Sequence, residues 1–312
     1  MEPPPPECRG LVSESGGDPN PFVAYLNSLH SCSAASENAL AESQCCNPFF
    51  SFIHVAHPLA ETIRETLLDS PRRHVILTGH AGDGKSTIAV EVFKTLSGKS
   101  FSEPLSKPLS RREDLSAEGR EITLIKDFSE WSEEERSALM TEMLDASSPR
   151  FLLISNTGTL LDAFKRYESR VGQDWVKIES DLLKSMDTSR SAPIEFHDTS
   201  FALINVAVFD NLVMAESILR RMLDAERWSA CASVECRQCC PMYQNVLLMQ
   251  RNLSVVCERM FLAYRRMYEY GTRLTLRQLT AHMAYMITSG LQYSDVAKMF
   301  QKASRPCMSE FM

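Results

Sequence analysis

The sequence predicts an α/β fold followed by an all-helical region. Short apolar runs rich in β-branched residues alternate with helical stretches between residues 71 and 211. A glycine-rich segment separates the first apolar run from the helix after it. Beyond residue 211 the strand patterns stop and helical spacing continues. Because alternating strands and helices are typical of a parallel sheet covered on both faces, we expect such a sheet in the first of these regions.

The chain before the expected sheet divides into two parts. Residues 1–20 are rich in Pro, Gly, Ser and Glu, and we expect them to be disordered. Residues 21–70 have helical spacing and are expected to lead into the first strand. The clearest helix there covers residues 58–68, with Pro at an early position and apolar residues at every fourth position.

The apolar pattern predicts strands at residues 74–78, 122–126, 151–155 and 202–208. The predicted helices that follow include residues 133–144, 160–167, 215–223, 247–270 and 276–288. The segment 98–120 is polar and interrupted by prolines, which favours a loop or insertion. The predicted domains are therefore an α/β core over 71–211 and a helical lid region over 212–312.

The glycine-rich segment, residues 79–86, fits the pattern G-x-x-x-x-G-K-[ST] of the P-loop of nucleoside triphosphatases. Its glycines allow the backbone to curl around a polyphosphate, and its N–H groups point positive charge at the anion. Lys85 is expected to contact the β- and γ-phosphates, and the Ser86 hydroxyl to ligate Mg²⁺. The alternative is a tight strand-to-helix turn with an ordinary surface lysine. The residues expected to bind the nucleotide are Gly79, His80, Ala81, Gly82, Asp83, Gly84, Lys85, Ser86 and Thr87.

Asp127 follows the second predicted strand. An apolar run that ends in Asp, downstream of a phosphate loop, is expected to hold Mg²⁺ through water beside Ser86. The alternative is a helix N-cap, for which Asp127 or Ser129 would serve, because an acidic stretch follows them.

Hydrolysis requires a group that orients or deprotonates the attacking water. Many related ATPases carry Glu directly after the Asp, whereas this chain has Phe128. Glu130 is the nearest acid that could reach forward from the strand end, and we expect it to serve as the base. Its alternative role is that of a solvated residue at an acidic helix start.

Asn156 follows the third predicted strand. In a parallel sheet this position lies at the carboxyl edge, where ligands bind. Asn156 is therefore a candidate to bind the γ-phosphate or the attacking water. The equally weighted alternative is a helix cap, provided by Thr157 or Thr159.

Together these residues resemble the AAA+ and STAND group of ATPases. The matching segments are residues 79–87, 122–127 and 152–156, with the helical region after 211. The resemblance implies a five-stranded parallel core, ATP-driven switching, and frequent assembly into homo-oligomers. The chain lacks the Asn-Lys-x-Asp segment that reads guanine, which favours ATP. Phe128 departs from the family pattern and puts efficient hydrolysis in question.

A narrower resemblance is to the ATPase component of bacterial phosphorothioation-dependent DNA restriction systems. The segments that carry it are residues 81–86, 126–130, 155–161 and 240–245. It implies a role in defence against foreign DNA, in which other protein subunits cut the DNA.

Four cysteines lie close together in the helical region: Cys231, Cys236, Cys239 and Cys240. The C-x-x-C spacing within them occurs in structural zinc sites, so bound Zn²⁺ is one interpretation. Free buried thiols and redox chemistry are the others.

Arginines of the helical region are candidates for contacts with the nucleotide. Arg277 could lean over it as a lid arginine, and Arg220 and Arg221 could act on the γ-phosphate of a neighbouring subunit. The alternative for each is an ordinary surface arginine on a helix.

Composition limits the partners and the compartment. The formal net charge is −7, so DNA contacts are expected only indirectly or through partners. The sequence has no apolar run of about 18 residues and no signal-peptide pattern, which favours a cytoplasmic protein without a membrane segment. The leading hypothesis is an ATPase switch or motor module that acts on partner proteins. A small-molecule kinase and a non-hydrolysing ATP-binding scaffold are the alternatives.

Overall fold

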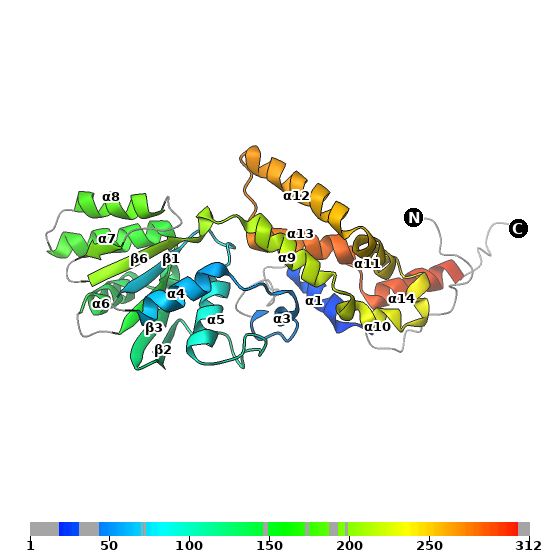
Figure 1. Ribbon diagram of the computed structural model, residues 1–312, viewed down its shortest axis with the longest axis horizontal. Coiled ribbons are helices and arrows are strands. Elements are labelled where there is room, and N and C mark those ends of the chain that lie inside the picture. The colour runs from blue at the N-terminus through cyan, green and yellow to red at the C-terminus, as the bar shows by residue number, and fades with distance from the viewer. Residues whose placement is uncertain are drawn as a thin grey trace, which may run out of the picture.

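The computed structural model describes residues 19–30, 44–69, 71, 73–145, 149–171, 175–186, 193–196 and 199–304. They form a six-stranded sheet with helices on both faces, and a helical region beside it (Figure 1). The predicted α/β class is therefore confirmed. The predicted disordered segment 1–20 lies almost entirely outside the described residues.

The strands are β1 (His74–Thr78), β2 (Arg112–Ala117), β3 (Arg120–Ile125), β4 (Arg150–Ile154), β5 (Ile194–Phe196) and β6 (Thr199–Asn205). Their order in the sheet is β2-β3-β4-β1-β6-β5. The inner strands β3, β4, β1 and β6 run parallel, and they correspond to the four strands predicted from the apolar pattern. The last of these predictions extended too far, because residues 206–208 form a 3₁₀ turn.

The sheet is mixed, which corrects the prediction of a parallel sheet. At one edge β2 pairs antiparallel with β3, and at the other edge β5 pairs antiparallel with β6. Glu118 and Gly119 join β2 to β3, and both have positive φ (51° and 73°), as two-residue hairpin turns of type I′ require. The segment 98–120 is therefore not a loop throughout. The apolar pattern did not predict β2, because this edge strand has mostly exposed and half-buried positions and no apolar run.

Alternate residues of the inner strands build two apolar cores. Val75 and Leu77 of β1 pack with α4 (Pro58–Leu68) and α5 (Lys85–Leu96) on one face of the sheet. Ile76 packs on the other face with residues of α6 (Glu133–Met143), α7 (Thr157–Val171) and α8 (Trp175–Met186). Burial of each such side chain contributes roughly 1.5–3 kcal/mol, so these two cores fix the positions of the strand ends.

The helical region has a core of its own. It combines α1 (Pro21–His30), α3 (Phe50–Ile53), α9 (Asn211–Met222), α10 (Ser229–Ala232), α11 (Pro241–Arg251), α12 (Leu253–Glu269), α13 (Leu276–Thr288) and α14 (Tyr293–Ser304). Helix α13, which was predicted with these bounds, lies along α1 and against α9 (Figure 1). The predicted helix 247–270 is interrupted at Asn252, which ends α11 and precedes α12.

The segment predicted as a helical lead-in, residues 21–70, belongs to both halves. Phe22 and Leu26 of α1 are buried in the core of the helical region, whereas Leu59 and Ile63 of α4 are buried against the sheet. Along the chain, helices of the helical region thus precede the first strand of the sheet. Within the described part of the chain, no helix has the length and apolar character needed to span a bilayer.

Candidate nucleotide site

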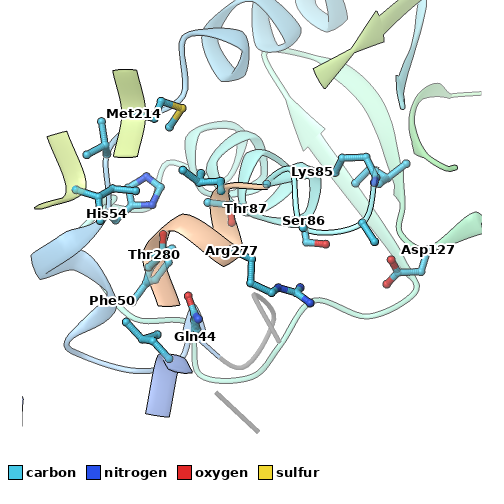
Figure 2. A pocket seen from close by; sticks show the side chains of 18 of the residues that line it. Gln44, Phe50, His54, Lys85, Ser86, Thr87, Asp127, Met214, Arg277 and Thr280 are labelled. Carbon is cyan, nitrogen blue, oxygen red and sulfur yellow. The ribbon is translucent and has the colours of Figure 1, made fainter. Parts of the chain in front are cut away.

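A cavity of about 330 Å³ lies between the sheet and the helical region (Figure 2). It gathers most of the residues that the sequence singled out. From the glycine-rich loop and the start of α5 they are Ala81, Gly82, Gly84, Lys85, Ser86 and Thr87, and from the strand ends they are Asp127, Glu130 and Asn156. Gly79, His80 and Asp83 belong to the same loop but are not among the residues that line the cavity.

The strand order explains why these residues meet. Strand β4 pairs with both β1 and β3, and all three strands run parallel. Their carboxyl ends therefore lie at one edge of the sheet, where ligands of such sheets commonly bind. The loop after β1, the turn after β3 and the start of α7 after β4 then face the same space.

The backbone of the loop requires glycine at two positions beside the cavity. Gly82 and Gly84 have φ of 88° and 95°, which L-residues rarely adopt. A Cβ atom added to Gly82 would lie 2.9 Å from Thr275 Oγ1 of the helical region. Helix α5 begins directly after Gly84, and the first N–H groups of a helix have no partner within it. This end of the cavity thus favours an anion.

Lys85 is held against the loop itself. Its Nζ donates hydrogen bonds of 2.9 Å to the carbonyl oxygens of Gly79 and His80. Burial lowers the pKa of Lys85, and Arg277 lowers it further. The carboxylates of Asp83 and Asp127 raise the pKa in opposition. The lysine therefore stands among charges of both signs at the end of the cavity where a phosphate would lie.

Asp127 adopts an unusual backbone conformation at the end of β3. Its φ of 49° is left-handed, which costs energy for a residue other than glycine and often occurs at functional sites. Its Oδ2 atom lies 3.7 Å from Lys126 Nζ. Figure 2 shows Asp127 and Ser86 at the same end of the cavity, with the guanidinium of Arg277 beside them.

The helix-cap interpretation of Asp127 does not fit the structure. Ser132 caps α6, because its side chain accepts from Glu135 N while the Glu135 side chain accepts from Ser132 N. Asp127 precedes only a 3₁₀ turn, Phe128–Glu130, and its side chain accepts no capping hydrogen bond there. Neither Asp127 nor Ser129 is therefore the cap of α6.

Phe128, the residue directly after Asp127, is fully buried in the core beside α6 and α7. The left-handed turn at Asp127 directs the chain so that residue 128 faces inward. Glu130, two positions later, is exposed and lines the cavity. The acid that lines the cavity is thus Glu130, three positions after Asp127, and not the residue directly after Asp127.

Asn156 is exposed at the end of β4 and lines the cavity. Its backbone N donates to Ser129 Oγ at 3.1 Å, which joins the ends of β3 and β4. The predicted cap residue Thr157 instead forms a hydrogen bond with Thr78 of β1 at 3.0 Å. Asn156 therefore has its side chain at the cavity, while Thr157 connects α7 to β1.

The other end of the cavity is largely apolar, and the sequence did not predict it. It is lined by Leu29, Phe50, Ile53, Val55, Met214, Ile218 and Leu276, together with Gln44, His54 and Thr280. These side chains come from α1, α3, α9 and α13 and from the segments before α3 and α4. No local pattern marks them, because each is an ordinary residue of a helix or connector.

A buried polar cluster supports this end of the cavity. Glu91 of α5 accepts hydrogen bonds from His57 N at 3.0 and 3.2 Å, and its Oε1 lies 3.0 Å from His54 Nε2. His57 Nδ1 accepts from Leu59 N and so caps α4. Burial, with a smaller effect of His54, lowers the pKa of His57 to about 4.

The arginines of the helical region have different roles. Arg277 lines the cavity, and its backbone N donates to Gly82 O at 3.2 Å. Arg220 pairs with Glu216 on its own helix at 2.7 Å, and Arg221 donates to the carbonyl of His54. Both of the arginines that could act on a neighbouring subunit therefore contact groups of their own chain.

The cysteine cluster does not form a metal site among the described residues. Cys231 and Cys240 are buried and form no disulfide, and Asn20 Nδ2 donates to Cys231 Sγ at 3.4 Å. Cys239 is disulfide-bonded, and the side chain of Cys236 lies outside the described part. Across the residues that the structure describes, no group of three or more His, Cys, Asp or Glu side chains is placed to hold a metal ion. The zinc interpretation stays a prediction, because the side chain of Cys236 is not among those described.

The chain matches no protein-family model, no curated protein and no solved structure.

Proposed function

We propose that this chain binds a nucleoside triphosphate, ATP, in the cavity, and that it is a P-loop ATPase acting as a switch. The observation that supports the proposal best is the convergence of Lys85, Ser86, Asp127 and Asn156 at one end of a cavity of about 330 Å³. That volume falls within the range of small-molecule sites. The glycine loop and the start of α5 offer N–H donors for phosphates at the same end.

Ser86 and Asp127 fit the needs of Mg²⁺. A hydroxyl and a carboxylate are oxygen ligands, and Mg²⁺ in nucleotide sites typically takes one or two protein oxygens while water and phosphate supply the rest. Bound there, Mg²⁺ would neutralise charge on the phosphates. Lys85 would release the carbonyls of Gly79 and His80 and donate to the β- and γ-phosphates instead.

Hydrolysis requires a base near the γ-phosphate. Glu130 lines the cavity beside Asp127, and its exposure keeps it accessible to water. Asn156, at the end of the intervening strand, would bind the γ-phosphate or orient the water. Lys85, Asp127, Glu130 and Asn156 are the residues that we propose as catalytic.

The apolar end of the cavity suits a nucleobase. Ile53, Val55, Met214 and Ile218 offer apolar surface from two sides, one on the segment before α4 and one on α9. A flat aromatic ring gains free energy from leaving water between such surfaces. A base bound there would contact both α9 and the segment from α3 to α4, which pack against each other in the core of the helical region.

The wider biological role rests on the resemblance alone. The AAA+ and STAND likeness suggests that the chain assembles with other subunits and drives a change of shape in them. The narrower likeness suggests a role in DNA restriction, with partner proteins contacting the DNA. A net charge of −7 agrees with indirect DNA contact.

Titration calorimetry with Mg-ATP tests the proposal. In Lys85→Ala, loss of charge-assisted hydrogen bonds to two phosphates should weaken affinity by about 100-fold or more. Lys165→Ala is the matched control, because Lys165 is exposed on α7 and does not line the cavity, and its affinity should equal that of wild type. Equal affinity in Lys85→Ala and wild type would sink the nucleotide assignment.

A further inference from the structure

The glycine-rich loop contains a buried acid that nucleotide binding alone does not explain. Asp83 has a side chain with 0% exposure, and its Oδ2 accepts from His80 N at 3.0 Å. A buried carboxylate is costly unless it is paired. Its partner is Arg273, 190 positions further along the chain, whose Nη1 donates to both carboxylate oxygens at 2.8 and 3.0 Å.

Two further contacts join the same segments. Arg273 lies just before Thr275, which caps α13 with a reciprocal hydrogen bond from Gln278. A Cβ on Gly82 would come within 2.9 Å of Thr275 Oγ1, and Arg277 N donates to Gly82 O at 3.2 Å. The first turn of α13 therefore lies directly on the loop, and Arg273 is the charged part of this contact.

Helix α13 is packed into the core of the helical region. Leu279, Met283, Ala284 and Ile287 are fully buried on one side of it, against α1 and α9. Close-packed cores shift as units because they do not deform continuously. A change at the start of α13 would thus move its neighbours as well.

The loop is constrained from two sides at His80. Its N–H is bound by Asp83, and its carbonyl accepts from Lys85 Nζ. If Lys85 turned to a phosphate, the hydrogen bond to the His80 carbonyl would be lost. The hydrogen bond from His80 N to Asp83 would remain. Within the described residues, Arg273 Nη2 is buried without a hydrogen-bond partner, so the guanidinium has a spare donor with which to follow Asp83.

We propose that Arg273 is a positioning residue for the phosphate loop, and that its ion pair with Asp83 couples nucleotide binding to the placement of α13. The inference rests on the proposed nucleotide site. It adds that the helical region senses the phosphate end of the cavity through a residue that does not touch the nucleotide.

A double-mutant cycle tests the coupling. Arg273→Gln and Asp83→Asn each remove one charge while keeping a similar shape, and the combined variant removes both. Each single variant should lower the affinity for Mg-ATP by about tenfold and abolish ATP-induced protection of α13 from hydrogen exchange. The affinity of the combined variant for Mg-ATP should be no lower than that of the single variant with the lower affinity, because both substitutions remove the same interaction.

Two further variants separate positioning from general damage. Arg273→Lys restores the charge and should recover part of both the affinity and the exchange response. Arg266→Ala is the control, since Arg266 is exposed on α12 and pairs with Glu269 of the same helix at 2.7 Å, and it should behave as wild type. Thermal melting establishes that each variant is folded before it is compared.

The outcomes distinguish the two proposals. If wild type binds Mg-ATP, Lys85→Ala does not, and Arg273→Gln binds and protects α13 as wild type does, the coupling is wrong and the nucleotide site stands. Additive losses in the combined variant also overturn the coupling. If neither wild type nor Lys85→Ala binds, the proposed function itself has failed.

Discussion

The two walls of the cavity are built in different ways. The α/β wall consists of strand ends fixed by ladder hydrogen bonds between two apolar cores, and it carries Lys85, Asp127, Glu130 and Asn156. The helical wall is packed around its own core, and it contributes mainly apolar side chains and Arg277. The candidate catalytic side chains thus lie on the α/β wall.

Among the described residues, several contacts between the walls are polar. They include the Arg273–Asp83 ion pair and the hydrogen bond from Arg277 N to Gly82 O. Contacts of this type rearrange at a lower cost than a hydrophobic core. Under the proposed function, the α/β wall would bind the nucleotide and carry out the reaction, and the helical wall would respond.

The largest effect is expected from Glu130→Gln, which alters only the α/β wall. If Glu130 is the base, ATP turnover should fall by about 100-fold or more, because general base catalysis contributes that much. Affinity for Mg-ATP should stay within about twofold, since the amide keeps the size of the side chain. Steady-state turnover and calorimetry measure the two quantities.

Glu134→Gln serves as the control, because Glu134 is an exposed residue in the first turn of α6 and does not line the cavity. Turnover of this variant should match wild type. Should Glu130→Gln retain normal turnover, then the base lies elsewhere on this wall, and the role given to Glu130 is wrong.

A smaller effect is expected where the two walls join, at His57. The pKa of His57 is about 4 in the folded protein against an ordinary 6.5, so between these values the unfolded chain binds more protons. Stability should therefore fall as the pH drops through this window, by about 2 kcal/mol between pH 7 and pH 5. Protonation would also remove the Nδ1 acceptor that caps α4.

Urea denaturation at pH 7 and pH 5 measures this effect against a variant. Asn is a good N-cap and does not titrate, so His57→Asn should keep the cap and lose the pH dependence that belongs to this residue. An identical pH dependence in wild type and His57→Asn would contradict the account of a neutral, buried His57.

The α/β wall could be predicted from the sequence to a large extent. Its inner strands are apolar runs, and a polar residue directly after such a run lies at the carboxyl edge, which is why Asp127 and Asn156 were found. The edge strands were missed. Strand β2 has alternating exposed residues, and β5 has only three residues, so neither has an apolar run.

The helical wall could not be predicted in the same way. Helical spacing gave the bounds of α13, but not its neighbours, because spacing along one helix does not identify the helix that packs against it. The pairing of Asp83 with Arg273 could not be predicted for the same reason. The two residues are 190 positions apart, and no sequence motif contains both of them.

The most direct test of the central claim is hydrogen exchange of the full chain in three states: without nucleotide, with Mg-ADP, and with Mg and a non-hydrolysable ATP analogue. The account predicts protection of residues 79–87 and 122–130 with both nucleotides, and an additional change in α9 and α13 with the ATP analogue. No protection of residues 79–87 at saturating nucleotide would contradict nucleotide binding in this cavity. Protection confined to the α/β wall, with no change in α9 or α13, would contradict the claim that the helical wall responds.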